Sequence, residues 1–291
     1  MPTVRCVAAV GAELGEGTLW DPLRGVIWWV DIRRARLHCY QPDSGAHRTQ
    51  ALGFRVTALG LTADDGLIAC GDPGFIRLAV DRELQVRLAR VLTCPTERPG
   101  NRFNDGKVDA TGCFWAGTMD DAESGSHGRW YRLDAAGRAT VIQEGVGVPN
   151  GPCFLADGTV LITDSPRRLI TALQLDARGG VYSRRDFARF TDTQGYPDGM
   201  TVDAENHVWV AFWDGWCVRR LSPAGHIVAE IPLPVQRPTC PTFGGTHLRQ
   251  LYISSATTGL RSEQLAAQPM AGGLLVLEPG VAGRAPERYR G

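Results

Sequence analysis

The chain has 291 residues, of which 43% are apolar and 21% are charged, and its 31 basic and 31 acidic side chains give a formal net charge of zero. This balance excludes a strongly basic nucleic-acid or anionic-membrane binder, and no apolar run reaches the length of a membrane span. We therefore expect neither nucleic acid nor a membrane as a partner, and a chain of this length can bury a substantial core.

The cysteines indicate a reducing compartment. Eight of them are scattered along the chain, without a C-x-x-C pair and without a histidine at zinc-finger spacing. Free, mostly buried thiols in the cytoplasm are the interpretation that this pattern favours. The apolar run near the N-terminus is too short for a convincing signal peptide, so we expect a cytoplasmic protein.

Short apolar runs separated by Asp, Gly and Asn predict β-strands along the whole chain, beginning with residues 4–10. From residue 16 a pattern recurs: a polar residue, an apolar run, a turn and a second apolar run. The clear copies are EGTLWDPLRGVIWWVD from Glu16, NDGKVDATGCFWAGT from Asn104, NGPCFLADGTVLITD from Asn150 and DGMTVDAENHVWVAF from Asp198. Weaker copies begin at Thr57 and Thr239, so successive copies are 41 to 48 residues apart.

Each copy is long enough for four short strands, and repeats of this length with four strands are typical of propeller blades. The second strand of each copy carries a large or apolar residue at the same phase: Trp28, Ala69, Trp115, Leu161, Trp209 and Tyr252. We therefore predict an all-β fold, a six-bladed β-propeller with four antiparallel strands per blade, formed by residues 1–291 as a single domain. A two-sheet β-sandwich is the alternative, but six equal repeats argue against it.

The two ends of the chain predict how the ring closes. The sixth copy has strand-like runs at 239–243, 250–254 and 273–277, a short helical turn near 262–267 between the last two, and then a polar tail, so its fourth strand is missing. Residues 4–10 are a strand without a blade. We expect this N-terminal strand to complete the last blade, which would remove an exposed sheet edge.

The first residue of every copy is polar and precedes the innermost strand, which lines the channel of a propeller. The six are Glu16, Thr57, Asn104, Asn150, Asp198 and Thr239. Equivalent positions form a ring, so two carboxylates and two amides should converge at one mouth. Such an oxygen set suits a hard divalent cation, although each residue alone could cap a strand or form a turn. Asn150 precedes a glycine, as a turn residue would, but its phase assigns it to this ring.

Two further features belong to the same mouth. Arg102 lies two residues before Asn104, so on an extended strand both side chains share a face. The loop GTMDDAESGSHG, residues 117–128, is long, polar and rich in glycine, and it could present Asp120 or Asp121 to a substrate. The competing interpretations are a surface salt bridge for Arg102 and an ordinary flexible connector for the loop.

A metal with oxygen ligands and open positions can polarise a carbonyl or phosphoryl oxygen, and a nearby carboxylate can serve as general base. The sequence has no G-x-S-x-G, H-E-x-x-H, P-loop or dinucleotide-binding motif. A serine nucleophile and a nucleotide cofactor therefore have no support. Metal-assisted hydrolysis of a small polar ester or lactone is the chemistry that these residues favour.

The stretches LGEGTLWDP, NRFNDGKVDATGCFWAGTMD, PNGPCFLADG and YPDGMTVDAENHVWVAFW resemble the gluconolactonase/regucalcin family of sugar lactonases over essentially the whole chain. The similarity is greatest to bacterial aldonolactonases such as xylono- and gluconolactonases. The resemblance implies one divalent cation, which in the family is calcium, zinc, manganese or iron, held by Glu16, Asn150 and Asp198. It further implies Asp198 as general base.

The resemblance also implies that Arg102 and Asn104 hold the sugar hydroxyls and that an acidic residue of the loop, among Asp120, Asp121 and Glu123, takes part. The expected reaction opens a small sugar lactone to the aldonic acid, in a monomer or weak homo-oligomer. Two alternatives stay open: a non-catalytic, calcium-binding regulatory propeller, and a phosphotriester or other ester hydrolase on the same scaffold.

Overall fold

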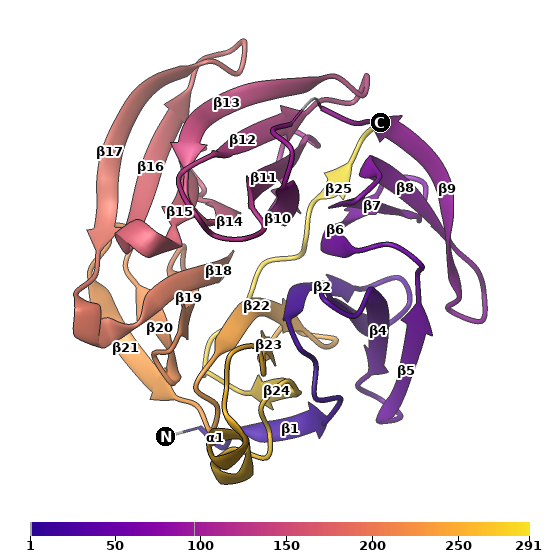
Figure 1. Cartoon of the computed structure of the whole chain (residues 1–291), viewed down its shortest axis with the longest axis vertical. Helices are drawn as coiled ribbons and strands as arrows, with labels where there is room; N and C mark the ends of the chain where they lie inside the picture. Colours follow the sequence, from indigo (N-terminus) through magenta and orange to yellow (C-terminus); the bar gives the residue numbers. More distant parts are fainter. Residues whose placement is uncertain (1, 96) are drawn as a thin grey trace.

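The computed structural model describes residues 2–95 and 97–291, which form six small antiparallel sheets around a central axis (Figure 1). From the axis outward, the first blade consists of β2 (Gly15–Asp21), β3 (Val26–Asp31), β4 (Arg36–Gln41) and β5 (Ala46–Ala51). The second consists of β6 (Val56–Thr62), β7 (Leu67–Gly71), β8 (Gly74–Val80) and β9 (Val86–Thr93). The third consists of β10 (Asn101–Val108), β11 (Phe114–Asp120), β12 (Gly128–Leu133) and β13 (Ala139–Val146).

The next two blades are β14 (Pro149–Phe154), β15 (Val160–Asp164), β16 (Leu169–Leu175) and β17 (Val181–Arg189), and β18 (Tyr196–Val202), β19 (Val208–Trp213), β20 (Cys217–Leu221) and β21 (Ile227–Pro232). The sixth consists of β22 (Pro238–Gly244), β23 (Gln250–Ser255), β24 (Leu274–Leu277) and β1 (Arg5–Ala8). The predicted six-bladed propeller is thereby confirmed, and so is the short helix α1 (Ser262–Ala267). Among the described residues no helix is long and apolar enough to cross a membrane.

The N-terminal strand closes the ring as predicted. β1 pairs antiparallel with β24, with Arg5 opposite Val276, and so becomes the outermost strand of the sixth blade. The sixth blade is therefore built from segments of both ends of the chain, and the segment between β1 and β2 links it to the first blade. This arrangement leaves no unpaired strand in the last blade.

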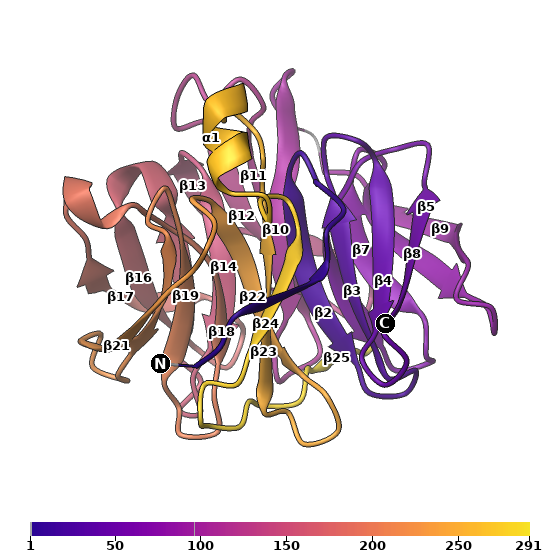
Figure 2. The same cartoon turned by 90° about the horizontal axis from the view of Figure 1, so that it is seen from below.

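The polar tail does more than the sequence predicts. It crosses the centre of the ring and ends in β25 (Arg288–Tyr289), which pairs in parallel with β6 and adds a fifth strand to the second blade (Figure 1). Tyr289 is buried, and its hydroxyl donates to the carbonyl of Asp134 in the third blade at 2.8 Å. Figure 2 shows α1 at one end of the propeller and β25 toward the other, so we call residues 278–291 the C-terminal strap of the far mouth.

We expect removal of residues 283–291 to destabilise the propeller, because it exposes the surface that Tyr289 covers and deletes the pairing of β25. Burial of such a ring contributes about 2–3 kcal/mol, which corresponds to a fall in Tm of about 3–5 °C for a chain of this size. Calorimetry of the truncated and full-length chains measures the difference. Tyr289→Phe is the control, since it keeps the ring and should lose less than half as much. An unchanged Tm on truncation would show that the strap is dispensable.

Three blades share a buried hydrogen bond that ties the second strand to the end of the first. The indole Nε1 of Trp28 donates to Asp21 at 3.3 Å, that of Trp115 to Asp109 at 2.8 Å, and that of Trp209 to Asp203 at 3.0 Å. These tryptophans occupy the repeated phase noted in the sequence, and each is at most 1% exposed. A buried indole N–H needs an acceptor, which explains why an aspartate accompanies the tryptophan.

The inner strand of every blade carries a β-bulge or similar irregularity at the repeated polar position. The register shifts between Glu16 and Leu19, Val56 and Ala58, Phe103 and Gly106, Asn150 and Cys153, Pro197 and Met200, and Pro238 and Pro241. An extra residue in one strand bends it and redirects its side chains. The bulge therefore determines the direction of the polar side chains that ring the channel.

Candidate functional site

Four of the six ring positions line a cavity of about 460 Å³ at the mouth where the inner strands begin: Glu16, Asn104, Asn150 and Asp198. Arg102 lines the same cavity. The two threonines of the ring do not line it. Thr57 contacts Cys70, and the hydroxyl of Thr239 donates to the backbone carbonyl of Gly15 at 2.5 Å. The structure thus gathers the carboxylates and amides in one pocket and uses the two threonines for packing between strands.

The carboxylates of Glu16 and Asp198 are 6% and 5% exposed, and a third, Asp105, is 4% exposed beside them. Burial is the main cause that raises the pKa of all three groups. The charge of Asp198 adds to the shift of Glu16, and Asp105 raises the pKa of both partners. The pKa of Asp105 itself rises to about 7. Two cations oppose these shifts, since Lys107 lowers the pKa of Asp105 and Arg102 lowers that of Glu16.

Asp105 is a residue that sequence reasoning missed. It directly follows the ring position in the third blade, where the first, fourth and fifth blades have Gly17, Gly151 and Gly199. Its carboxylate accepts from the backbone N–H of Gly106 at 2.7 Å. An ionisable residue at a position that is otherwise mostly glycine was the signal that could have identified it.

A chain of hydrogen bonds joins three blades across the pocket. The Arg102 guanidinium donates to the Asn104 amide oxygen at 2.8 Å, and the Asn104 amide nitrogen donates to the amide oxygen of Asn150 at 2.9 Å. The amide nitrogen of Asn150 then donates to Ser165 at 2.9 Å, whose hydroxyl donates to the carbonyl of Pro197 at 2.6 Å. Because each donor has an acceptor, the orientation of both amides is determined. The amide oxygen of Asn150 therefore faces Asn104, and this oxygen has a second lone pair.

The structure explains why glycine follows Asn150. Gly151 has φ +82°, and a Cβ there would lie 2.6 Å from the methyl carbon of Met200. Side chains are disfavoured both by that backbone conformation and by the contact. The turn belongs instead to Gly158, whose N–H donates to the carbonyl of Leu155 between β14 and β15. Asn150 lies in the inner strand, as its phase in the repeat predicts.

The loop acids take three different places. Asp121 bridges two arginines, accepting from Arg102 Nε at 2.6 Å and from Arg55 Nη1 at 2.7 Å. Asp120 bonds within the loop, to the hydroxyl of Ser124 and the backbone N–H of Ala122, and it does not line the described pocket. Glu123 does line it. The conformation of the loop, which the sequence does not determine, separates these acids.

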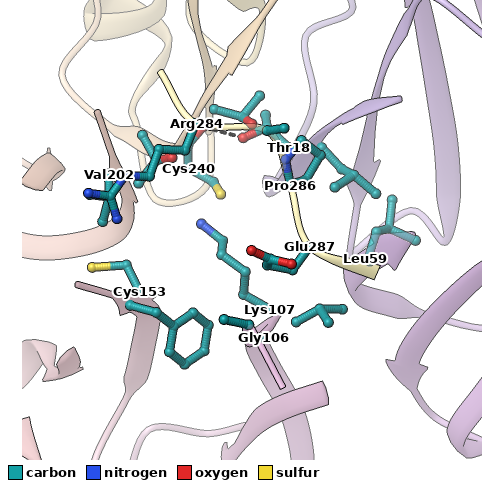
Figure 3. Close-up of a pocket in the computed structure, with 18 of the residues that line it drawn as sticks. Thr18, Leu59, Gly106, Lys107, Cys153, Val202, Cys240, Arg284, Pro286 and Glu287 are labelled. Atoms are coloured by element: carbon teal, nitrogen blue, oxygen red, sulfur yellow. Dashed lines mark hydrogen bonds between the residues drawn. The ribbon is translucent and has the colours of Figure 1, made fainter. Parts of the chain in front are cut away.

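A second cavity of about 260 Å³ is lined by Asp105 and by residues of the C-terminal strap. Lys107, Cys153 and Cys240 line it together with Arg284 and Glu287 of the strap (Figure 3). The Lys107 ammonium donates to the carbonyl of Met200. Burial raises the pKa of Cys153 to about 12, so this thiol is not a nucleophile at neutral pH. Asp105 lines this second cavity and not the first, although it raises the pKa of both Glu16 and Asp198.

The pocket has the donor set of a hard divalent cation. One oxygen of Asp198 is buried without any hydrogen-bond partner, and Glu16 accepts one bond, from the Gly17 N–H at 3.1 Å. A cation would compensate both the missing partner and the mutual repulsion of the carboxylates. In the described part of the chain no group of three or more His, Cys, Asp or Glu is arranged to hold a metal. The candidate ligands instead combine two carboxylates with an amide oxygen.

Comparison with known proteins agrees with the architecture and the pocket. Residues 14–257 match the SMP-30/gluconolactonase/LRE-like region. The chain is 36% identical over 293 aligned positions to the 6-deoxy-6-sulfogluconolactonase of Pseudomonas putida, covering 99% of both chains. It is 35% identical to the pentonolactonase XacC of Haloferax volcanii, covering 87% of this chain and 85% of the relative. The crystal structure of a regucalcin from Agrobacterium tumefaciens, described as a calcium-binding protein, superposes with a TM-score of 0.91 at 30% identity, covering 99% and 98% of the two chains.

The fold and the pocket define a six-bladed propeller with an acidic, amide-lined cavity at one mouth. The chain belongs to the SMP-30/gluconolactonase/LRE-like family. The resemblance read from the sequence is thereby confirmed. The expectation of an enzyme of the lactonase class is confirmed. The relatives from Pseudomonas putida and Haloferax volcanii are both named as lactonases.

Proposed function

We propose that this chain hydrolyses a sugar-derived lactone to the aldonic acid, with the help of one divalent cation at the mouth of the propeller. The observation that carries the proposal is the buried cluster of Glu16, Asp198 and the Asn150 amide next to Arg102, inside a pocket of about 460 Å³. That volume suits a single sugar ring. Polar groups that converge in a concave pocket, beside carboxyl groups of raised pKa, are typical of an active site.

Glu16, Asn150 and Asp198 would hold the cation, and its chemistry there would be Lewis-acid polarisation of the lactone carbonyl. Calcium, zinc, manganese and iron all accept such oxygen ligands to different degrees, and metal analysis of the purified protein would distinguish them. Asp198 has an oxygen without a protein partner, so it is placed to take a proton from a water that attacks the carbonyl carbon. The carbonyl–oxygen ester bond then breaks, and Asp198 returns its proton to the ring oxygen, which leaves as a hydroxyl group. The carboxylic acid formed at the old carbonyl carbon then loses its proton to solvent and becomes the aldonate.

The remaining pocket residues position the sugar. Arg102 still has guanidinium hydrogens beyond those that bind Asp121 and Asn104, and they can donate to the hydroxyls of a substrate. Asn104 keeps both Arg102 and Asn150 in place. We assign the loop carboxylate that accepts from a sugar hydroxyl to Glu123, and to Asp121 the role of orienting Arg102. Asp120, which bonds within its own loop, is assigned no contact with the substrate.

The test is acid release measured in a pH-stat with a panel of 1,4- and 1,5-aldonolactones, before and after removal of metal by a chelator. We expect hydrolysis of at least one sugar lactone, its loss on chelation and its recovery when one of the four divalent cations is added. Turnover of a phosphotriester in the same assay examines the ester-hydrolase alternative. Undiminished lactone hydrolysis by metal-free protein would rule out the metal-dependent scheme.

A calcium-binding protein without catalysis is the second candidate, and the regucalcin from Agrobacterium tumefaciens, described as calcium-binding, favours it. Both candidates use the same ligands, so only activity separates them. Calcium binding measured by calorimetry, with no acid release from any lactone, would support the second candidate.

Arg102→Lys is expected to raise KM for the lactone about tenfold or more, because a lysine cannot reproduce the fork of donors that a guanidinium offers to hydroxyls and to Asp121. We expect a smaller change in kcat. Initial rates over a range of lactone concentrations measure both constants. Arg55→Lys is the matched control, since Arg55 contacts Asp121 but does not line the cavity that contains Glu16 and Asp198. This control substitution should change KM less than threefold. Equal effects of the two substitutions would contradict the role of Arg102.

We further expect the enzyme to act in the cytoplasm, as a monomer or a weak homo-oligomer. All eight cysteines are free in the structure, which supports a reducing compartment. Light scattering after size exclusion measures the oligomeric state.

A further inference from the structure

Two aromatic residues of the fifth blade, Tyr196 and Trp213, line the mouth pocket together with Asp198 and Asp214. Tyr196 lies two residues before Asp198 on the same inner strand, and both residues line the pocket. Trp213 is the last residue of β19 and stands opposite Tyr196 in the strand register. It also lines the pocket. Both aromatic residues therefore line the pocket from the blade that carries the proposed general base.

Both rings are held from outside the pocket by arginines. The guanidinium of Arg168 lies 4.2 Å from the centre of the Tyr196 ring, and that of Arg237 lies 4.7 Å from the centre of the Trp213 ring. Arg237 is itself fixed, because its Nε donates to Asp214 at 2.7 Å. Each guanidinium is attracted to the ring that it covers. These contacts favour the ring positions seen in the structure.

The chemistry of the pocket differs between its two sides. Arg102 and Asn104 of the third blade line it with hydrogen-bonding groups, whereas Tyr196 and Trp213 of the fifth blade line it with aromatic side chains. A closed lactone ring has the matching asymmetry, with hydroxyl groups on its rim and C–H groups on its faces. An aromatic face attracts the slightly positive hydrogens of such a C–H face. The product is an open chain, which has no ring face to stack.

We propose that Tyr196 and Trp213 form a stacking wall that recognises the closed lactone ring and discriminates against the open-chain aldonate. This inference rests on the proposed lactonase function and adds the basis of its ring selectivity. The wall orients the lactone with its carbonyl toward Asp198 and weakens binding once the ring has opened. Product release is thereby favoured without any movement of the protein.

The experiment compares the KM for a 1,4-aldonolactone with the inhibition constant of the corresponding aldonate. We expect Tyr196→Ala and Trp213→Ala each to raise KM about tenfold, with kcat changed less than threefold and the inhibition constant of the aldonate changed less than twofold. Tyr196→Phe and Trp213→Phe keep a ring face and should retain most of the lactone affinity. An equal weakening of lactone and aldonate, or an unchanged KM in both alanine variants, would overturn the proposal.

Trp216→Ala is the matched control, because this tryptophan is 43% exposed on the same turn but does not line the pocket. It should leave both constants unchanged. A thermal melt of each variant shows whether it folds, and the phenylalanine variants test the wall even if an alanine variant does not.

A binding measurement separates failure of this inference from failure of the proposed function. Titration of the 1,4-aldonolactone should quench a part of the tryptophan fluorescence that is absent in Trp213→Phe. If the wild-type protein shows this quenching but hydrolyses no lactone, the wall is supported and the lactonase function is refuted. If it hydrolyses lactones and the quenching is the same in Trp213→Phe, the wall is refuted and the lactonase function stands.

Discussion

Asp198→Asn is expected to abolish lactone hydrolysis, lowering kcat by about a thousandfold or more. The amide cannot accept a proton from the attacking water, and loss of a positioned general base costs about 10²–10⁴ in rate. The substitution also removes one of two anionic candidate ligands from the metal site, so it should weaken metal binding. A pH-stat assay at several metal concentrations measures the rate, and calorimetric titration measures the metal affinity.

Asp203→Asn is the control for a buried aspartate on the same blade. Asp203 is buried at the other end of the inner strand, where it accepts from Trp209 and Arg220. Its substitution should lower Tm but leave kcat within about threefold of the wild type at temperatures well below that Tm. If Asp198→Asn retained kcat at saturating metal, Asp198 would not be the base.

Removal of the metal is expected to make the stability of the protein fall steeply between pH 5 and pH 8. Burial raises the pKa of Asp105 from its ordinary value of 3.8 to about 7, and it raises those of Glu16 and Asp198 as well. In this interval the carboxyl groups of the unfolded chain have already lost their protons, whereas the folded protein retains them. The unfolded state therefore binds fewer protons, so the free energy of unfolding decreases as the pH rises through the folded pKa.

Urea unfolding of metal-free protein at pH 5 and pH 8 measures this fall. Asp105→Asn should reduce it by about 2–4 kcal/mol at pH 8, because the neutral amide removes one of the three buried charges and retains an acceptor for the Gly106 N–H. Added divalent cation should restore most of the stability of the wild type at pH 8. A metal-free protein equally stable at both pH values would contradict the clustering of the three carboxyl groups.

Much of the scaffold and of the site was predictable because the chain repeats itself. A fixed phase in each repeat places Glu16, Asn104, Asn150 and Asp198 on inner strands, and propeller symmetry brings inner strands together whatever their separation in sequence. Closure by the N-terminal strand followed from counting strands. These predictions needed only the period and the strand order.

The remaining features depend on interactions that no local pattern records. The pairing of β25 with β6 joins segments more than 220 residues apart, and the tail that contains it has no strand-like run. The separate places of Asp120, Asp121 and Glu123 depend on the loop conformation, in which Glu123 adopts φ +55°. Tyr196 and Trp213 belong to different strands and meet only through the register of β18 and β19.

The two ends of the chain have a consequence for how the ring comes apart. A propeller opens most easily at the seam between its first and last blades, and here β1 ties the N-terminus into the sixth blade while β25 ties the C-terminus into the second. The sixth blade therefore cannot peel away without breaking its pairing with the N-terminal strand, and the second blade cannot do so without breaking its pairing with the C-terminal strand. Unfolding should consequently be a single cooperative event that involves all six blades, and protease nicking should begin in the outer loops and not at the chain ends.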